Sequence, residues 1–268
     1  MRVFIISDME GVAGITKWEQ TKGGHPHYPE GQKLYTAEMN AAARGAFDAG
    51  SDEVVMMDCH GAGQGWTFNS LLHEELDPRV EYVVQDSWTE HTETLEEGCD
   101  AALFVGMHAM AGADRGNLSH TVSGTDWHYL RFNGVEVGET GINAALCGQW
   151  RTPVLMVTGD DVVCAEAKAL LGDGLTTVQV KKSYGRFSAK NVAPQRARDM
   201  IYEGAKSALS DLEAVEPYIV EPAEIEVRLH QASEAQVYKN RPDIEFKDGR
   251  TIVSRADDWW TAWKRIYL

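Results

Sequence analysis

Residues 2–11 read Arg-Val-Phe-Ile-Ile-Ser-Asp-Met-Glu-Gly, an unbroken apolar run that ends in two acidic residues. Similar runs follow at residues 53–57, 101–105, 153–158 and 176–181, with a shorter candidate at 80–84. Continuous apolar runs, unlike alternating ones, are typical of strands covered on both faces, as in parallel sheets. The sequence therefore predicts buried parallel strands, the first of them at residues 2–7.

Helical patterns separate these runs. Apolar and small residues recur every three or four positions between Leu34 and Ala46, and Gly50 follows as a candidate cap. Further helices are expected around Ile142 and at residues 163–171. This alternation predicts an α/β fold with a mostly parallel sheet flanked by helices.

The pattern changes towards the C-terminus. A helix is expected from Pro194, then a strand at residues 225–229 with one polar face, and last a helix rich in tryptophan. We therefore expect an α/β domain over residues 1–190 and a smaller α+β region over residues 191–268. The length of 268 residues allows one large or two modest domains.

Composition excludes several classes of partner. The chain has 25 Lys and Arg against 41 Asp and Glu, a net charge of −16. This charge repels phosphate backbones and anionic membrane surfaces, so we expect neither nucleic-acid nor membrane binding. No apolar run approaches the roughly 20 residues of a membrane span, and the N-terminus lacks the pattern of a signal peptide. Four cysteines without C-x-x-C spacing suit a reducing compartment. A cytoplasmic protein is the expectation.

Acidic and histidine side chains follow three of the predicted strands. Asp8 and Glu10 come after the first, His60 after the second and His108 after the third. Ligands gather outside the carboxyl ends of strands in open α/β sheets. Asp, Glu and His are also the residue types that bind Zn²⁺ or Mn²⁺. The sequence therefore predicts a metal site at this edge of the sheet.

Each of these motifs has a simpler interpretation when it stands alone. An isolated Asp-x-Glu more often caps a helix, and a lone histidine such as His60 or His108 is more often a hydrogen-bonded turn residue. Glu139, in the first turn of an expected helix, is equally well explained as a partner of the helix dipole. Agreement among three strand ends is what favours the metal site.

The glycine-rich stretch at residues 61–65 suggests a dinucleotide site, but the pattern fails. The G-x-G-x-x-G fingerprint needs a sixth-position glycine, and Trp66 stands there. A phosphate-binding P-loop and a G-x-S-x-G nucleophile motif are also absent from the sequence. Cys59, beside His60, is expected to be a small buried residue.

Five motifs taken together resemble the D-aminopeptidase family of zinc-dependent, self-compartmentalising bacterial peptidases. They are Asp8-Met9-Glu10-Gly11, Asp58-x-His60, Gly106-x-His108-Ala109, Ser119-His120 and Val137-Gly138-Glu139-x-Gly141-x-Asn143-Ala144. The likeness covers nearly all of the first 210 residues in order. The segment from His108 to His120 departs from the family's pattern by one extra residue.

The resemblance implies an enzyme with two Zn²⁺ ions per subunit, for which Mn²⁺ or Co²⁺ are also chemically suitable. The ligands would be Asp8, Glu10, His60, His108 and Glu139, and residues 1–190 would form the catalytic domain. His120 would be the catalytic histidine, which the family treats as a nucleophile. Because two metals can activate a bridging water, we favour an acid or electrostatic role for it.

The implied substrates are short peptides or amino-acid amides with a free N-terminus, with D-residues among them. The resemblance also implies a homo-oligomeric ring, for which a decamer is the size the family suggests. Trp259, Trp260 and Trp263 could lie in such an interface or pack the second region onto the first. Two alternatives stay open: a metal-dependent phosphatase or other amidohydrolase, and a non-catalytic metal-binding module. Against a phosphatase, only Lys17, Lys22 and Arg115 lie near the ligand motifs.

Overall fold

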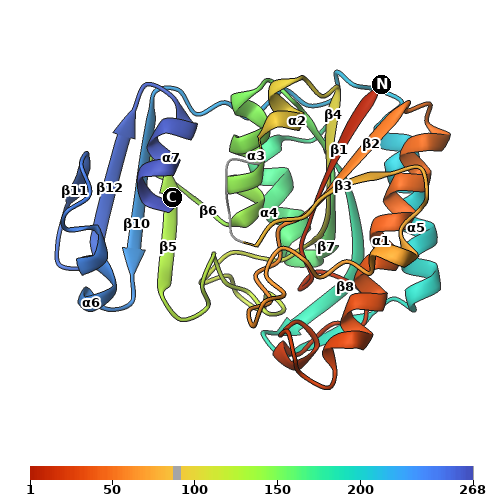
Figure 1. Cartoon of the computed structure of the whole chain (residues 1–268), viewed down its shortest axis with the longest axis horizontal. Helices are drawn as coiled ribbons and strands as arrows, with labels where there is room; N and C mark the ends of the chain where they lie inside the picture. The colour runs from red at the N-terminus through yellow and green to blue at the C-terminus, as the bar shows by residue number, and fades with distance from the viewer. Residues whose placement is uncertain (87–91, 268) are drawn as a thin grey trace.

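The computed structural model describes residues 1–86 and 92–267, and its main element is a sheet, sheet A, that crosses the centre of the molecule (Figure 1). Its strands within the described residues are β1 (Arg2–Ser7), β2 (Glu53–Asp58), β3 (Glu81–Val83), β4 (Ala101–Met107), β7 (Val154–Asp160), β8 (Thr176–Gly185) and β9 (Ser188–Asn191). All neighbours pair in parallel except β8 and β9, which form an antiparallel hairpin. The predicted apolar runs are therefore confirmed as strands of a mostly parallel sheet.

The order of the strands in sheet A determines where a site can form. Across the sheet they run β3-β2-β1-β4-β7-β8-β9, so the chain moves outward in one direction from β1 and then returns to place β4 on its other side. The crevice beyond the carboxyl ends of β1 and β4 is thus the point where the direction of winding reverses, which is the usual ligand position in such sheets.

Helices cover both faces of sheet A. Helices α1 (Tyr28–Asp48) and α5 (Pro194–Ala208) pack on one face, and α3 (Glu139–Gln149) and α4 (Asp161–Leu171) pack on the other (Figure 1). The remaining helices are short or terminal: α2 (Glu93–Glu96), α6 (Ala232–Ala235) and α7 (Trp259–Tyr267). Among the described residues, no helix combines the length and apolar character needed to cross a membrane.

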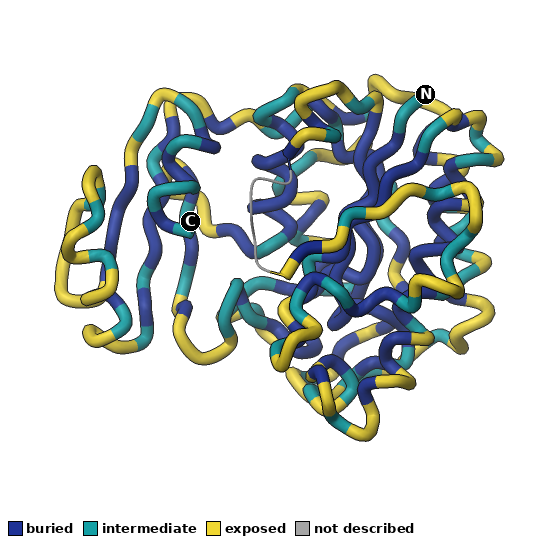
Figure 2. The backbone as a smooth tube through the Cα atoms, in the orientation of Figure 1, coloured by how far each residue is buried: buried dark blue, intermediate teal, exposed yellow. Residues whose placement is uncertain are grey.

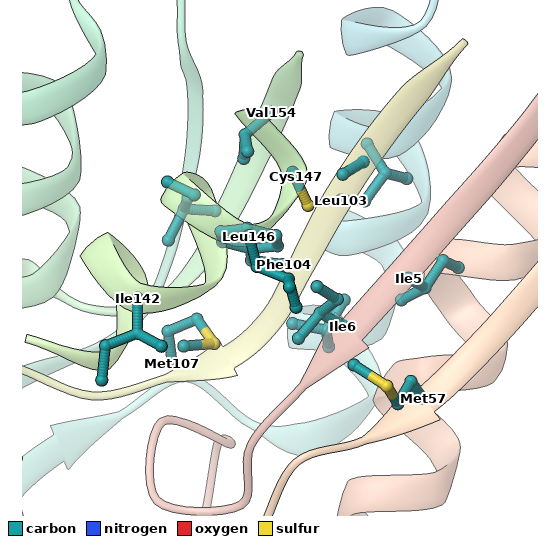
Figure 3. Packing of buried hydrophobic residues seen from close by; sticks show 14 of the residues in the cluster. Ile5, Ile6, Met57, Leu103, Phe104, Met107, Ile142, Leu146, Cys147 and Val154 are labelled. Carbon is teal, nitrogen blue, oxygen red and sulfur yellow. The ribbon is translucent and has the colours of Figure 1, made fainter. Parts of the chain in front are cut away.

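The apolar runs form the core because both faces of each strand are covered. Ile5 and Ile6 on β1 and Leu103 and Phe104 on β4 are fully buried. Leu146 of α3 lies against this part of the sheet, as Figure 3 shows. In Figure 2 the backbone of these strands is dark blue, the colour of buried residues. Polar ligands at the strand ends are consequently held by a rigid, close-packed frame.

A second sheet, sheet B, lies beside the first in Figure 1 and is antiparallel throughout. In spatial order it contains β11 (Ile244–Phe246), β12 (Thr251–Ala256), β10 (Ala223–Leu229), β5 (Trp127–Phe132) and β6 (Val135–Val137). The β5–β6 hairpin was not predicted, although its turn, Asn133-Gly134, has positive φ at both residues. Asn-Gly between alternating apolar residues is a strong hairpin signal that the sequence offered.

The expected division at residue 190 stays a prediction. Sheet B takes strands from both sides of that position, since β5 and β6 precede it and β10 to β12 follow it. Helix α5, which follows residue 190, packs on α1 in the layer that covers sheet A.

The tryptophans of α7 pack inside the subunit. Trp259 and Trp263 are 1% exposed and stack with ring centroids 5.4 Å apart. Both also meet Phe132 of β5 edge to face. Of the two interpretations of these tryptophans, internal packing is therefore the one the structure shows.

Candidate metal centre

Close approach of β1 and β4 brings the first ligands together. The backbone N–H of Asp8 donates to the carbonyl of Val105 at 2.9 Å, and that of Gly11 donates to the carbonyl of Gly106 at 2.7 Å. A Cβ at Gly11 would stand 2.0 Å from the carbonyl oxygen of Met107. One at Gly106, where φ is +74°, would stand 2.1 Å from that of Asp8. Only glycine at both positions allows this contact.

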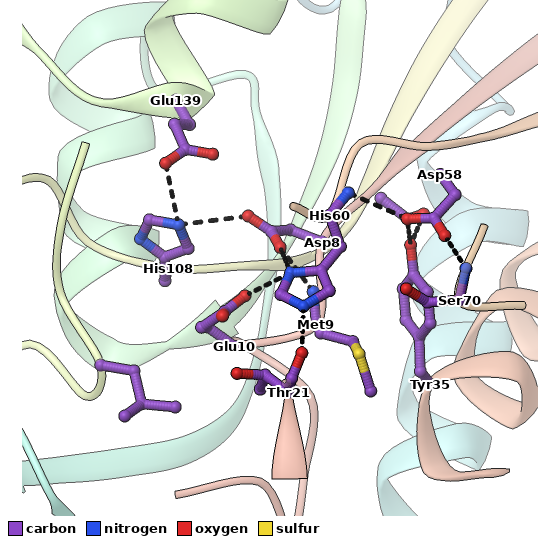
Figure 4. Close-up of polar contacts among 12 residues, drawn as sticks. Asp8, Met9, Glu10, Thr21, Tyr35, Asp58, His60, Ser70, His108 and Glu139 are labelled. Carbon is purple, nitrogen blue, oxygen red and sulfur yellow. Dashed lines mark hydrogen bonds and ion pairs between the residues drawn. The ribbon is translucent and has the colours of Figure 1, made fainter. Parts of the chain in front are cut away.

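Asp8 lies at the centre of the cluster and turns its two oxygens towards different histidines (Figure 4). Oδ1 is 3.0 Å from His60 Nδ1, and Oδ2 is 3.1 Å from His108 Nε2. The side chain is 3% exposed. One buried carboxylate is thus shared between two histidines that come from different strands.

Glu10 and Glu139 complete the two sides. Glu10 Oε2 is 3.1 Å from His60 Nδ1, and Glu139 Oε1, from the first turn of α3, is 3.3 Å from His108 Nε2. The five residues expected to bind metal are therefore brought together. They form two groups that share Asp8: Asp8 with Glu10 and His60, and Asp8 with His108 and Glu139.

Hydrogen bonds fix the orientation of both histidine rings. His60 Nε2 lies 2.7 Å from the carbonyl of Thr21, and His108 Nδ1 lies 3.0 Å from that of Ala109. Because a carbonyl oxygen can only accept, those ring nitrogens carry the proton. The other nitrogen of each ring faces carboxylate oxygens, so either a second proton or a metal ion must lie between that nitrogen and the oxygens. A metal ion requires the neutral ring, whose lone pair binds it.

A further acid, Asp58 at the end of β2, supports this arrangement without joining it. Its carboxylate accepts hydrogen bonds from the backbone N–H of His60 at 2.9 Å and from the hydroxyl of Tyr35 at 2.9 Å. It also accepts one from the backbone N–H of Ser70 at 2.5 Å. Asp58 thus holds the backbone of His60 in place. The end of β2 therefore supplies both a candidate ligand, His60, and the residue that positions it, Asp58.

Two tests of fit favour a metal in this cluster. Glu10 Oε2 and His108 Nε2 are buried yet lack hydrogen-bond geometry to any partner among the described residues. In addition, ligand atoms of Asp8, Glu10 and His108 lie within 4.8 Å of one another. Oxygen and imidazole nitrogen ligands at this spacing suit Zn²⁺.

The charges of the cluster shift its pKa values strongly. Burial alone would lower the pKa of His60 and His108, but Glu10 and Glu139, respectively, with Asp8 beside both, raise it well above its usual range. Burial would raise the pKa of Glu139, but the charge of His108 lowers it to about 2. The site therefore favours positive charge between its carboxylates, which a divalent cation can supply.

His120 lies against the cluster but has a different environment. Its ring stacks on that of His108 with centroids 4.0 Å apart and meets the Trp18 ring edge to face at 5.3 Å. Nδ1 donates to the carbonyl of Leu118 at 2.9 Å, and Nε2 is 3.7 Å from Glu139 Oε1. Burial, followed by the charge of His108, lowers its pKa. His120, His108 and Glu139 also have ligand atoms within 4.8 Å of one another.

A cavity of about 830 Å³ opens beside these residues. Its wall includes four of the predicted ligands and His120, together with Trp18, Lys22, Gly124 and Arg186. Cys59 also lines it, but burial and the charge of Asp58 raise its pKa well above the usual value, so the thiol stays protonated. The volume suits a small organic ligand.

Arg186 is the residue that the sequence interpretation missed. It lies in the turn between β8 and β9, far along the chain from every ligand motif, yet it lines the cavity. The expectation that only Lys17, Lys22 and Arg115 could supply a cation near the ligands was therefore wrong. Arg115 contacts Asp114 at 3.6 Å and does not line the cavity. The residues that Arg186 contacts lie nearly 70 positions away in the chain, so the sequence around Arg186 could not predict these contacts.

Comparison with known proteins shows which family the chain resembles. A D-aminopeptidase of Bacillus subtilis (strain 168) is 30% identical over 272 residues, which cover 100% of this chain and 96% of that protein. The structure is also similar to that of the Zn-dependent D-aminopeptidase DppA from Bacillus subtilis, a self-compartmentalizing protease. The TM-score is 0.89 at 28% identity, over 99% of this chain and 95% of that one. The family model described as D-aminopeptidase matches residues 1–268. The chain therefore belongs to the D-aminopeptidase family of peptidases.

Proposed function

We propose that this peptidase is a di-zinc aminopeptidase that removes N-terminal residues from short peptides, D-residues included. The observation that carries the proposal is the pair of ligand groups sharing Asp8, in which one ring nitrogen of each histidine faces two carboxylates. The similarity to a zinc-dependent D-aminopeptidase supports the choice of metal and reaction.

In this proposal Asp8 would help to hold both ions. Glu10 and His60 would complete the ligands of one ion, and His108 and Glu139 would complete those of the other. Zinc, when bound, polarises a peptide carbonyl and lowers the pKa of water. Mn²⁺ or Co²⁺ would also suit these ligands. The protein's own contribution is rigidity, because Thr21 and Ala109 orient the two rings through the nitrogen that faces away from the cluster.

His120 would assist as an acid or electrostatic group. Its Nδ1 proton is engaged by the carbonyl of Leu118, so Nε2 is the atom that faces the cluster and can carry a proton. The lowered pKa keeps the ring neutral near pH 7, where Nε2 can accept a proton and pass it to the leaving amine. This role leaves direct nucleophilic attack unnecessary.

Assembly into a homo-oligomeric ring larger than a dimer is part of the proposal. The structural relative is described as self-compartmentalizing. Several large apolar side chains that an interface could cover are exposed here, including Trp66 at 41%, Tyr184 at 57% and Phe187 at 59%. Enclosure would admit short, flexible peptides and exclude folded proteins, so cleavage should fall steeply as peptides lengthen. Light scattering that gives a 29.7 kDa monomer at micromolar concentration would contradict the ring.

Metal analysis tests the centre directly. The purified protein should contain close to two zinc ions per chain, and chelation should abolish peptide hydrolysis until zinc is restored. His60→Ala should reduce the zinc content itself. His128→Ala is the matched control, since His128 is exposed on β5 in sheet B and should leave the zinc content as it was. Full activity without metal would contradict the proposal.

The same assay separates the two rival functions. A phosphatase would draw on Lys22 and Arg186 beside the cavity, so phosphate monoesters should be offered alongside peptides. A non-catalytic module would bind zinc and hydrolyse neither. Peptide hydrolysis with no phosphate release is the expected result.

A further inference from the structure

Three charged side chains line the cavity without belonging to the ligand cluster: Lys22, Asp86 and Arg186. The proposed reaction so far gives none of them a task. Arg186 is the one whose position is fixed by several contacts, and its surroundings show what it can bind.

The β8–β9 turn holds Arg186 against the loop that carries His120. Its backbone carbonyl accepts hydrogen bonds from the backbone N–H of Leu118 at 2.7 Å and from Asn117 Nδ2 at 2.9 Å. Its side-chain Nε donates to the carbonyl of Ser119 at 3.1 Å. The backbone and side chain of Arg186 together are therefore tied to the three residues that directly precede His120, and the guanidinium itself is tied to Ser119.

Aromatic packing and a glycine leave room for the guanidinium beside the reacting groups. Its Cζ lies 5.7 Å from the centre of the Trp18 ring, the same ring that meets His120. Arg186 Nη2 and His120 Cβ lie 3.4 and 3.7 Å from the point where a Cβ at Gly124 would stand. The missing side chain at Gly124 thus keeps open the space between Arg186 and His120.

The outer nitrogens of Arg186 are available for a ligand. Within residues 1–86 and 92–267, no carboxylate lies within 4.0 Å of its guanidinium, and only Nε donates to the protein. Two N–H groups in a fixed fork match the two oxygens of a carboxylate.

A dipeptide carries a carboxylate close to the bond that an aminopeptidase cleaves. Each extended residue adds at most about 3.6 Å, so the C-terminal carboxylate of a dipeptide lies roughly one residue beyond the scissile bond. We propose that Arg186 binds the C-terminal carboxylate of the substrate and so selects dipeptides with a free C-terminus. This inference rests on the proposed aminopeptidase function.

Paired substrates give the test. The measurement is kcat/KM for a D-dipeptide and for the same dipeptide with an amidated C-terminus. For the wild-type protein the free acid should be preferred by about 10- to 100-fold, the range for a charge-assisted hydrogen bond. Arg186→Gln should bring the ratio of acid to amide close to one, mainly through a higher KM for the acid. Arg186→Lys should retain part of the preference.

Control variants keep the result interpretable. Arg115→Gln removes a cation outside the cavity and should leave the ratio unchanged. Lys22→Gln removes the other cation of the cavity. If this variant lost the acid preference while Arg186→Gln kept it, the assignment to Arg186 would be overturned. Equal losses on acid and amide in Arg186→Gln, with zinc content intact, would overturn it too.

The wild-type protein separates this inference from the function on which it rests. Zinc-dependent hydrolysis of both substrates without a preference for the acid would contradict the role of Arg186 alone. Hydrolysis of neither substrate by the zinc-loaded protein would contradict the aminopeptidase proposal itself. The comparison of acid and amide in the wild type stands even if an Arg186 variant fails to fold.

Discussion

Sheet A gathers carboxylates at one edge and removes them from water, whereas the ion pairs of sheet B keep exposed members, including the cations that pair with the buried Glu226. Asp8 and Glu10 are 3% and 2% exposed. On sheet B, the side chains of Arg255 and Glu245 form an ion pair while 48% and 59% exposed. Burying a charged group costs free energy unless the group is paired or binds a cation. A solvent-exposed ion pair changes the free energy of folding only slightly. The burial of acids in sheet A is therefore what marks it as the functional half.

The largest effect should come from breaking the buried cluster. His108→Ala removes the only ring that faces both Asp8 Oδ2 and Glu139 Oε1 among the described residues. We expect zinc content to fall and kcat/KM to drop by more than about 10³-fold, because a bound metal is what lowers the pKa of water towards neutrality. Zinc analysis and peptide hydrolysis on one sample measure both. Retained zinc would show that His108 is not a ligand.

Removing a tryptophan from helix α7, which packs on sheet B, should affect stability instead. Trp259→Ala empties a site that is 1% exposed and packs on Phe132. The free energy of unfolding should fall by about 3–5 kcal/mol in a urea titration. Val237→Ala, at a side chain 68% exposed in the same region, is the control and should stay within about 0.5 kcal/mol. A loss of zinc from folded Trp259→Ala protein would contradict the separation of the two sheets.

His120→Ala should divide catalysis from metal binding. Because His120 contacts the cluster through Glu139 and the His108 ring, we expect zinc to remain. The value of kcat should fall by at least about 10²-fold, as is typical for a lost acid–base group. If His120→Ala loses zinc and His108→Ala does not, the two roles are reversed.

A buried acid in the layer over sheet A should make stability depend on pH. Burial raises the pKa of Glu38 to about 7, despite the hydrogen bond from the Ala13 N–H and the charge of Lys181. The folded state thus keeps a proton that the unfolded state loses near its ordinary value of 4.5. The free energy of unfolding should therefore fall as the pH rises from about 5 to 7.

Glu38→Gln removes this titration. Relative to the wild type, the variant should gain about 1–3 kcal/mol of stability between pH 5 and pH 8. Urea titrations of both proteins at several pH values give the comparison. Parallel stability curves for the two proteins would show that Glu38 ionises normally in the folded state.

The smallest effect belongs to the exposed ion pairs of sheet B. Glu245→Gln preserves the shape of the side chain while removing its charge beside Arg255. We expect a change in the free energy of unfolding below about 1 kcal/mol, which shrinks further in high salt. A change of several kcal/mol would mean that this face is covered in the assembled protein.

How much the sequence predicted differs between the same two sheets. The buried central strands of sheet A were predictable because each is a continuous apolar run, and their ligands were predictable because parallel strands end at one edge. Strand β9, with the sequence Ser-Ala-Lys-Asn, has no such run and was not predicted. The first strand matches its predicted bounds, and β4 extends two residues beyond its expected end, to Met107. His108 and Glu139 come together through the packing of α3 on β4. The family resemblance predicted that both residues bind metal, but the local sequence did not predict that they meet.

Sheet B was harder to predict because its strands come from distant parts of the chain. The hairpin of β5 and β6 pairs with β10, almost a hundred residues later. Arg186 escaped notice for the same reason, since its contacts with Asn117 and Ser119 depend on how two separate loops dock. Periodicity describes the environment along one segment and carries no information about which loops meet.

The tight contact between Gly11 and Gly106 restricts which variants selection can retain. Any side chain at either position would press on the backbone oxygen of the opposite segment, so the two segments carrying Asp8, Glu10 and His108 would be forced apart. In a library randomised at both positions and selected for activity, only the parental pair should survive. Gly61 has nothing within 4 Å of its Cβ position and should accept many replacements. Mutational tolerance would thus differ sharply between the glycines that pack β1 against β4 and Gly61, which lines the cavity.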